Sequence, residues 1–211
     1  MRRLPVYILL DTSGSMNGEP IEAVNTGMSL MMSALIQDPH ALESVYVSII
    51  TFDIEAKTVV PLTALDQLQL PHINCPQSGP THLGLALQML TQQVEQEVQK
   101  STAEAKGDWA PFLFIMTDGK PSDIQLFNEM CLATRAVGFA SIIGCIAGPR
   151  ARSEDLESLC DHIVSLDTLD TASFTSFFKW VSSAIAVGSR SRGVSAVILL
   201  PPAPPEIQLV F

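Results

Sequence analysis

Short apolar runs recur along the chain and are separated by longer amphipathic stretches. Runs of roughly four to eight residues without polar alternation are typical of strands buried on both faces of a parallel sheet. The runs of this kind are Leu4–Leu10, Val45–Phe52, Pro111–Met116, Ala140–Ile146 and His162–Leu166.

One further run, Thr58–Leu62, follows Val45–Phe52 after only Asp53–Lys57. A parallel crossover needs about a dozen connecting residues, so this segment is too short to provide one. The two runs therefore predict an antiparallel hairpin at an edge of the sheet.

Helical spacing of apolar residues marks the stretches between the strands. Pro20 suits a first helical turn, and the helix after it has a methionine-rich apolar face that is typical of core packing. The residues on that face are Ile21, Val24, Met28, Met31, Met32 and Leu35. A second helix begins near Thr81, with Leu83, Leu87, Leu90, Val94 and Val98 on one face.

Three more helices complete the pattern. Ser122 or Asp123 can cap a helix that runs to about Val137 and stops at Gly138. Ser153 can cap a short helix that ends near Cys160. The last helix, Ala172–Val187, is closed by Gly188.

Strands that alternate with helices predict an α/β fold: a doubly wound, mainly parallel six-stranded sheet with one antiparallel edge strand and helices on both faces. We place this domain at residues 1–188. Residues 189–211 form a linker and an apolar, proline-rich tail. The tail either folds against its own domain or acts as a docking segment for another protein.

Composition and charge narrow the classes of function. The chain has 211 residues, of which 47% are hydrophobic and 16% charged, as expected of a globular domain. Its formal net charge of −10 disfavours nucleic acid as a partner. Because the apolar run after Arg2 and Arg3 stops at Asp11, it resembles neither a signal peptide nor a membrane span. We expect a cytoplasmic protein with no membrane contact.

Two carboxylates follow strands that should be close in the sheet. Asp11 follows the first strand and Asp118 follows Pro111–Met116. Ligands of doubly wound sheets bind beyond the carboxyl ends of the strands. Ser13 and Ser15 share the loop of Asp11, and Thr81 begins the helix after a long loop, so five oxygen-bearing side chains are candidates to hold a hard cation.

These residues resemble the metal-ion-dependent adhesion site of von Willebrand factor A domains: Asp11-x-Ser13-x-Ser15, then Thr81, then Asp118-Gly119. The resemblance extends over about Val6–Val187. Three stretches also resemble the bacterial TerY-type proteins linked to tellurium resistance: PVYILLDTSGSM, GEPIEAVN and MTDGKPSD.

The resemblance implies a role for each candidate residue. Ser13 and Ser15 would ligate a divalent ion, Mg²⁺ first and Mn²⁺ or Ca²⁺ otherwise, and Thr81 would ligate it directly or through water. Asp11 and Asp118 would act mostly through bound waters. The ion would grip an acidic residue of a partner protein. A stress-response setting is implied, with kinases, phosphatases or other tellurium-resistance proteins as possible partners.

Enzymatic alternatives have weaker support in the sequence. A metal-dependent phosphohydrolase, or a regulator of a kinase or phosphatase pathway, is possible on the same metal site, with Asp11 as the candidate nucleophile. However, Ser13 stands where a phosphatase-like signature has a second Asp, and dinucleotide and P-loop glycine patterns are missing. A redox or metal-resistance role for the scattered cysteines, Cys75, Cys131, Cys145 and Cys160, is a third option; His72 and Cys75 have ligand-like spacing but no second pair. We therefore expect no catalytic activity.

Overall fold

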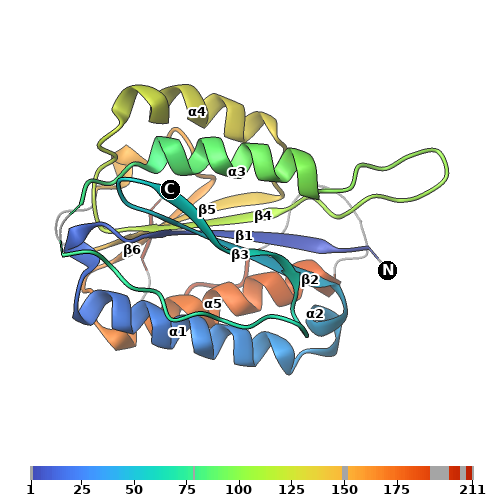
Figure 1. Ribbon diagram of the computed structural model, residues 1–211. Coiled ribbons are helices and arrows are strands. Elements are labelled where there is room, and N and C mark those ends of the chain that lie inside the picture. The colour runs from blue at the N-terminus through green and yellow to red at the C-terminus, as the bar shows by residue number, and fades with distance from the viewer. Residues whose placement is uncertain (1, 78, 149–151, 191–199, 205–207, 211) are drawn as a thin grey trace.

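One sheet forms the centre of the molecule, with helices on both of its faces (Figure 1). The computed structural model describes residues 2–77, 79–148, 152–190, 200–204 and 208–210. Within them the sheet has seven strands in the order β3-β2-β1-β4-β5-β6-β7. The strands are β1 (Leu4–Asp11), β2 (Val45–Phe52), β3 (Ala56–Ala64), β4 (Phe112–Thr117), β5 (Ser141–Ala147), β6 (His162–Leu166) and β7 (Gln208–Val210).

The helices form a layer on each face of this sheet. Helices α3 and α4 cover one face, and α1, α2 and α5 lie on the other (Figure 1). They are α1 (Glu19–Ile36), α2 (Pro39–Ser44), α3 (Leu83–Glu97), α4 (Ile124–Ala136) and α5 (Thr171–Arg190), together with the short 3-10 helices η1 (Gly14–Met16) and η2 (Ser153–Asp155).

The predicted α/β fold is confirmed, including the hairpin. Strands β2, β1, β4, β5 and β6 are mutually parallel, and β3 pairs antiparallel with β2 at one edge. The chain leaves β1 through α1 toward β2 on one side and reaches β4 from α3 on the other side. The order of strands therefore reverses around β1 and β4, and folds of this kind bind ligands beyond the carboxyl ends of the strands at such a reversal.

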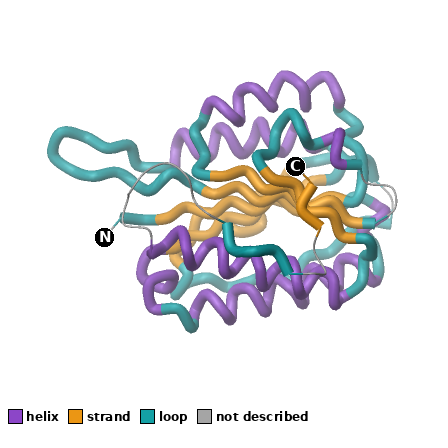
Figure 2. The backbone as a smooth tube through the Cα atoms, turned by 180° about the vertical axis from the view of Figure 1, so that it is seen from behind, coloured by secondary structure: helices purple, strands orange, loops and turns teal. Residues whose placement is uncertain are grey.

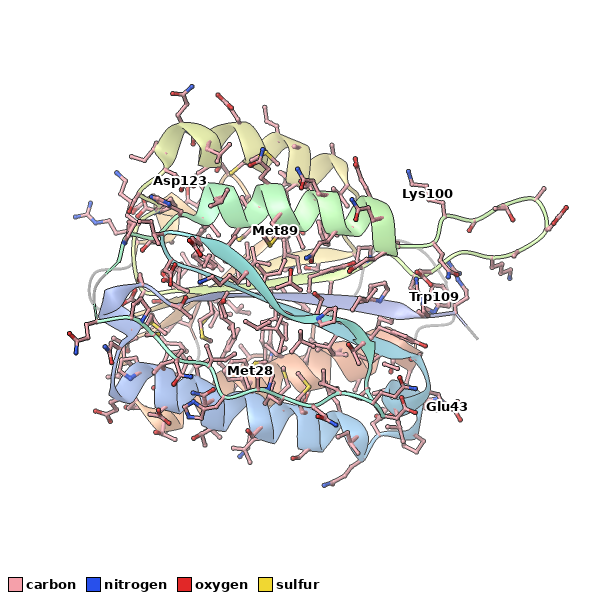
Figure 3. The ribbon with its side chains drawn as sticks, in the orientation of Figure 1. Met28, Glu43, Met89, Lys100, Trp109 and Asp123 are labelled. Atoms are coloured by element: carbon pink, nitrogen blue, oxygen red, sulfur yellow. The ribbon has the colours of Figure 1, made fainter. Side chains whose placement is uncertain are left out.

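Each face of the sheet has its own apolar core. Met28 on α1 is buried in the layer between α1, α5 and the sheet, whereas Met89 on α3 packs against the other core (Figure 3). The methionine-rich face of α1 is buried throughout, from Ile21 to Leu35, as its spacing predicts. The two cores fix the strands and helices whose ends meet at this reversal of strand order.

Four details of the chain differ from the prediction. Helix α5 continues through Gly188 to Arg190 instead of ending there. Gly188 is needed for close packing, because an added Cβ would lie 2.7 Å from Phe112 Cε2. The predicted helix at Ser153 is only one 3-10 turn. Helix α2, capped by Asp38, has no counterpart in the prediction.

The fourth difference is a seventh strand. Strand β7 comes from the proline-rich tail and pairs antiparallel with β6, at the edge opposite β3. Its three residues, Gln208–Val210, are too few to give a periodic signal of their own. Residues 191–199 of the predicted linker and tail lie outside the described residues.

No helix in the described part of the chain is both long enough and apolar enough to span a membrane.

Candidate metal-binding site

The candidate residues meet beyond the carboxyl ends of β1 and β4. Asp11 is the last residue of β1, and Asp118 directly follows β4. Since β1 and β4 are parallel neighbours, with Leu10 opposite Met116, both carboxylates emerge at the same end of the sheet. Ser13 and Ser15 lie in the turn after Asp11 because η1 reverses the chain there.

Hydrogen bonds link four of these residues. The Ser15 hydroxyl donates to Asp118 Oδ1 at 2.8 Å, and Ser15 Oγ lies 3.3 Å from Ser13 Oγ. The backbone N–H of Ser13 donates to Asp11 Oδ1 at 2.8 Å. The loop after β1 and the loop after β4 thus form one cluster of oxygen atoms.

Thr81 reaches the same cluster from a third segment. Its hydroxyl lies beside Gly119, where an added Cβ would be 3.7 Å from Thr81 Oγ1. The Thr81 backbone is fixed by Ser122: Thr81 N–H donates to Ser122 Oγ at 3.2 Å, and Ser122 N–H donates to Thr81 O at 2.8 Å. The structure therefore brings all five predicted residues to one place.

The cluster is partly enclosed. Asp11 and Ser13 are almost fully buried, and Thr81 and Asp118 retain little exposure, whereas Ser15 faces solvent. Buried carboxylates at one site make an environment that favours a cation. The exposed Ser15 marks the side from which an ion or a partner can approach.

The acidity of Asp11 reflects this enclosure. Burial raises the pKa of Asp11 to about 6, hydrogen bonds from Thr117 and Ser13 oppose the rise, and the negative charge of Asp118 adds to it. Thr117 Oγ1 donates to Asp11 Oδ2 at 2.6 Å. Both oxygens of Asp11 are thus engaged and fixed in position.

Three residues contribute to the site without having been predicted to do so. Thr117 fixes Asp11, as above, and Ser122 fixes Thr81. Asp53 follows β2, next to β1, and its Oδ2 lies 3.5 Å from the hydroxyl of Thr12. The signal for Asp53 was a carboxylate directly after a buried strand, the same signal that identified Asp11 and Asp118.

Asp123 has a different role from the one its position suggests. It precedes α4, but its side chain makes no capping bond to that helix. Instead it accepts hydrogen bonds from the N–H groups of Gly84 and Leu85, at 3.1 and 2.9 Å, at the start of α3. Asp123 therefore ties the segment that follows Asp118 to the helix that follows Thr81.

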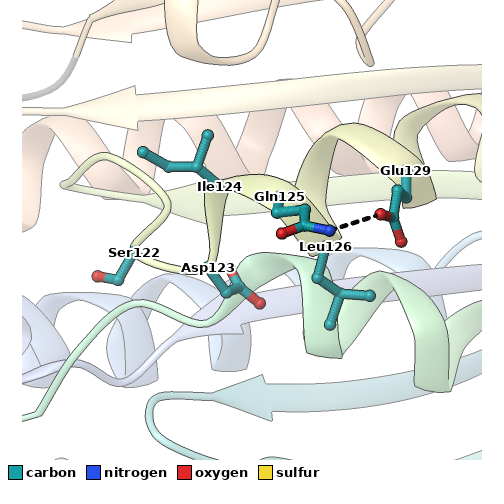
Figure 4. Close-up of a pocket in the computed structure, with 6 residues that line it drawn as sticks. All are labelled: Ser122, Asp123, Ile124, Gln125, Leu126 and Glu129. Carbon is teal, nitrogen blue, oxygen red and sulfur yellow. Dashed lines mark hydrogen bonds between the residues drawn. The ribbon is translucent and has the colours of Figure 1, made fainter.

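A shallow hollow lies beside this link, at the beginning of α4 (Figure 4). Ser122, Asp123, Ile124 and Leu126 line it, and Gln125 donates to Glu129 along its wall at 3.2 Å. Ile124 is about half exposed there. The hollow thus combines polar groups with one exposed apolar side chain.

The residues behind the redox alternative do not form a second centre. His72 Nε2 lies 3.3 Å from Glu22 Oε2 and 3.5 Å from Asn25 Nδ2, both on α1. Burial first, and then the charges of Asp11, Asp53 and Asp118, raise the pKa of Cys75 to about 12, so its thiol is protonated at neutral pH.

The other three cysteines are buried, and burial raises the pKa of each thiol. In the described residues no group of three or more His, Cys, Asp and Glu side chains is arranged to hold a metal ion. The oxygen cluster, with its hydroxyl groups, is therefore the metal-site candidate that the described geometry supports.

Similar folds occur in proteins of known structure. A mussel byssus protein, proximal thread matrix protein 1, was solved with a zinc-occupied MIDAS motif; it is 18% identical, with a TM-score of 0.62 over 86% of this chain and 48% of that one. A von Willebrand factor type A protein from Catenulispora acidiphila is 15% identical, with a TM-score of 0.64 over 88% of this chain and 43% of that one.

A third similar structure is the open conformation of SpaC, a pilus adhesin from Lactobacillus rhamnosus GG. It is 11% identical, with a TM-score of 0.69 over 89% of this chain and 30% of that one. This chain thus spans less than half the length of each of these three proteins. No curated protein matches it significantly in sequence.

The family model of the von Willebrand factor type A domain matches residues 6–172, which is most of the chain. The match includes all five residues of the oxygen cluster. The chain belongs to the von Willebrand factor type A domain family.

Proposed function

We propose that this domain binds a divalent metal ion, Mg²⁺ in the first place, and uses it to grip a carboxylate of a partner protein. The observation that carries the proposal is the linked cluster of oxygens from Ser13, Ser15 and Asp118, with Asp11 and Thr81 beside it. Three separate segments of the chain converge there, at the reversal of strand order.

The donor set fits a hard cation. Hydroxyl and carboxylate oxygens are the ligands that Mg²⁺, Mn²⁺ and Ca²⁺ prefer, whereas zinc sites usually contain nitrogen or sulfur. Ser13, Ser15 and Thr81 would hold the ion through their hydroxyls, and Asp11 and Asp118 would hold it mostly through water. Bound there, the ion supplies a positive charge that the neutral hydroxyls do not cancel.

That residual charge is what would attract a partner. A carboxylate from another protein can complete the shell of a cation held by few charged ligands, and such contacts are strong and directional. Exposure of Ser15 leaves an approach to the cluster. Ile124, which is exposed in the hollow at the start of α4, would favour a partner that also carries an apolar residue.

The similar structures support a role in binding. The mussel protein was solved with zinc in its MIDAS motif, and SpaC is a pilus adhesin. Both share only the fold with this chain at their low identities, so the extension of metal binding and adhesion to it is part of the proposal.

We infer a binding role rather than a phosphohydrolase because of the state of Asp11. A nucleophile needs a free oxygen within reach of substrate. Asp11 is almost fully buried and both of its oxygens accept hydrogen bonds, from Ser13 and Thr117. This arrangement supports a structural carboxylate that orients the metal site.

A bacterial stress-response setting is the finer part of the proposal. It rests on the three TerY-like stretches of the sequence, and it includes a cytoplasmic location and partners among kinases, phosphatases or other tellurium-resistance proteins. The family match extends to von Willebrand factor type A domains in general.

The test is a pull-down from host lysate with the purified domain, in Mg²⁺ and again in EDTA. We expect a partner that is retained only in Mg²⁺ and lost with Ser13→Ala. The matched control is Ser33→Ala, because Ser33 is an exposed serine of α1 whose hydroxyl donates only to its own helix, at Ser29 O. Retention that is equal in EDTA would overturn the metal grip.

A second assay separates the enzymatic alternative. The domain is incubated with a generic phosphomonoester and Mg²⁺ or Mn²⁺, and we expect no turnover above that of the buffer. Turnover that disappears with Asp11→Asn would instead identify a metal-dependent phosphohydrolase.

A further inference from the structure

The proline-rich tail lies on the outer side of α5. Trp180 Nε1 donates a hydrogen bond to the carbonyl oxygen of Pro201 at 2.9 Å. Trp180 is only 3% exposed, and Leu200 and Ala203 on either side of this contact pack against the core of the α5 layer. The indole N–H is thus satisfied by the tail and not by the domain's own core.

A hollow surrounds this contact. Ser176, Lys179, Trp180 and Ser183 of α5 form one wall, and three prolines, Pro201, Pro202 and Pro204, form the other. Prolines have no N–H and their carbonyls point outward in an extended chain, so an aromatic ring with a neighbouring N–H donor is well suited to them.

The tail makes a second contact at the edge of the sheet, where the chain ends in Figure 2. Gln208, Leu209 and Val210 of β7 lie opposite Ser165, Val164 and Ile163 of β6. Leu209 also packs against the core. In the described residues β6 has β5 on one side and only β7 on the other, so removal of the tail would expose an apolar strand edge.

We propose that α5 and the edge of β6 form a receptor for an extended proline-rich segment, which the chain fills with its own residues 200–204 and 208–210. The ligand has two parts: a Pro-Pro stretch that accepts the hydrogen bond of Trp180, and an apolar strand that pairs with β6. A separate peptide with this pattern binds the same receptor when it displaces the tail.

The contacts of the tail are suited to exchange. Leu200, Pro201, Ala203 and Leu209 are only partly buried, and β7 has three residues. Small contacts of this kind open locally at a lower free energy than the whole domain. The tail stays bound because it is tethered, which gives it an effective concentration of about millimolar.

The experiment cuts the tether. A protease recognition sequence replaces part of residues 191–199 in the full chain, and the cut and uncut proteins are compared. A fluorescent synthetic peptide of residues 200–211 is then titrated into each. We expect the cut protein to keep its tail during rapid gel filtration at high concentration, and to exchange it for the labelled peptide on dilution.

The uncut protein is the first control, because its tethered tail should raise the apparent Kd of the peptide at least tenfold. A peptide of the same composition in scrambled order should not bind. Leu209→Asp in the peptide should abolish strand pairing with β6 and weaken binding by at least tenfold, and this change cannot unfold the receptor.

The role of Trp180 is tested by Trp180→Phe, which keeps an aromatic ring but removes the N–H donor. We expect peptide binding to weaken about fivefold, which corresponds to one hydrogen bond. Binding of the wild-type and scrambled peptides with equal affinity, or immediate loss of the tail after the cut with no peptide uptake, would overturn the proposal. So would unchanged affinity in a folded Trp180→Phe domain.

This receptor does not depend on the metal site. The peptide titration is therefore run in EDTA as well as in Mg²⁺, and the same Kd is expected in both. A domain that fails the lysate test can still bind the peptide, and the reverse also holds.

Discussion

At the scale of one residue, the carboxylate of Asp11 is expected to favour metal binding but to destabilise the metal-free domain. Its pKa is raised to about 6 because its carboxylate is buried next to Asp118. Because this pKa is higher in the folded than in the unfolded state, protonation of Asp11 stabilises the folded domain. This stabilisation is present at low pH and is lost as pH rises through about 6. At neutral pH, without metal, the ionised carboxylate therefore destabilises the folded domain.

Asp11→Asn should consequently stabilise the metal-free domain above pH 6. The amide oxygen can still accept from Ser13 N–H, and the amide N–H₂ can donate to Thr117 Oγ1, whose hydroxyl then bonds to Gly119 O, now 3.1 Å away. The gain should be on the order of 2 kcal/mol at pH 8 and should vanish near pH 4. Urea unfolding in EDTA across this pH range measures it.

The same variant should lose the stabilisation that Mg²⁺ gives to the wild type. A bound ion stabilises the folded state by mass action, so the wild-type midpoint should rise with Mg²⁺ concentration. If Mg²⁺ raised the unfolding midpoint of Asp11→Asn as much as that of the wild type, Asp11 would not take part in metal binding. If Asp11→Asn were less stable than the wild type in EDTA, burial would not be the cause of the raised pKa of Asp11.

At the scale of elements, α1 and α5 touch through a glycine. A Cβ added at Gly27 would lie 2.2 Å from Cδ2 of Phe178, which is buried in α5. The two helices can approach this closely only because position 27 has no side chain. Their contact matters to function because α1 begins just after the serine loop, and α5 carries the receptor for the tail.

Gly27→Ala should therefore destabilise the domain despite the better helix propensity of alanine. Overpacking of a buried site costs about 1–3 kcal/mol, which exceeds the gain of about 1 kcal/mol from propensity. Thr26→Ala, at the exposed neighbouring position, is the control and should be neutral or slightly stabilising. Denaturant unfolding of the two variants compares them, and equal stability would show that Phe178 moves aside freely.

Asp123 joins the beginnings of α3 and α4, which lie close to the oxygen cluster. Asp123→Ala removes the acceptor of the Gly84 and Leu85 N–H groups and should cost about 1 kcal/mol of stability, as the loss of a helix cap does. It should also weaken Mg²⁺ binding several-fold, because Thr81 immediately precedes this turn. Calorimetric titration checks the second effect; Asp170→Ala, which removes the carboxylate that accepts from Ser173 N–H at the start of α5, is a matched capping control with metal affinity unchanged.

The sequence predicted elements with strong periodicity and missed those that depend on distant contacts. The limits of β2 and β6 were predicted to the residue, since each is a buried apolar run between polar groups. The end of α5 was predicted at Gly188, but packing against Phe112 overrides the tendency of glycine to end a helix. Strand β7 is defined by its pairing with the edge of β6, a distant contact that the sequence pattern does not reveal.

In the candidate site, too, local patterns predicted some residues and missed those that depend on distant contacts. Asp11 and Asp118 could be placed together because strand ends meet at one edge of a parallel sheet. The bonds of Asp123 to α3, and of Ser122 to Thr81, join segments about forty residues apart, and no local pattern encodes such pairs.

On the scale of the whole molecule, the two ends of the sheet differ in the residues that they carry. The oxygen cluster lies at one end, near Asp123 in Figure 3, and a long loop that carries Lys100 and Trp109 extends from the other end. Arg2 and Arg3 anchor that loop. The Arg2 guanidinium lies 3.6 Å from the centre of the Trp109 ring, and Arg3 forms a forked ion pair with Asp108. The N-terminal arginines thus stabilise the end of the sheet opposite to the oxygen cluster.

Arg3→Lys tests whether this separation is real. Lysine keeps the positive charge but cannot reproduce the fork, in which Nε and Nη2 of Arg3 donate to Asp108 at 2.9 and 2.6 Å while Nη2 also donates to Glu97 O. The Asp108 side chain is only 2% exposed, so its weakened partner leaves a nearly buried charge. We expect a loss of about 2 kcal/mol in unfolding free energy, and faster hydrogen exchange in the loop.

Metal affinity should stay the same in this variant. Strand β1 separates Arg3 from Asp11 by eight residues, or about 26 Å of extended chain, and a change in packing at one end has no direct contact with the other. Calorimetric titration with Mg²⁺ at a temperature where both proteins are fully folded makes the comparison. Lys57→Arg on β3 is the control for an exchange between the two cations, because Lys57 forms an exposed ion pair with Glu55. If Arg3→Lys changed the Mg²⁺ affinity more than threefold, the two ends of the sheet would have to be coupled through β1, and the loop would belong to the binding mechanism.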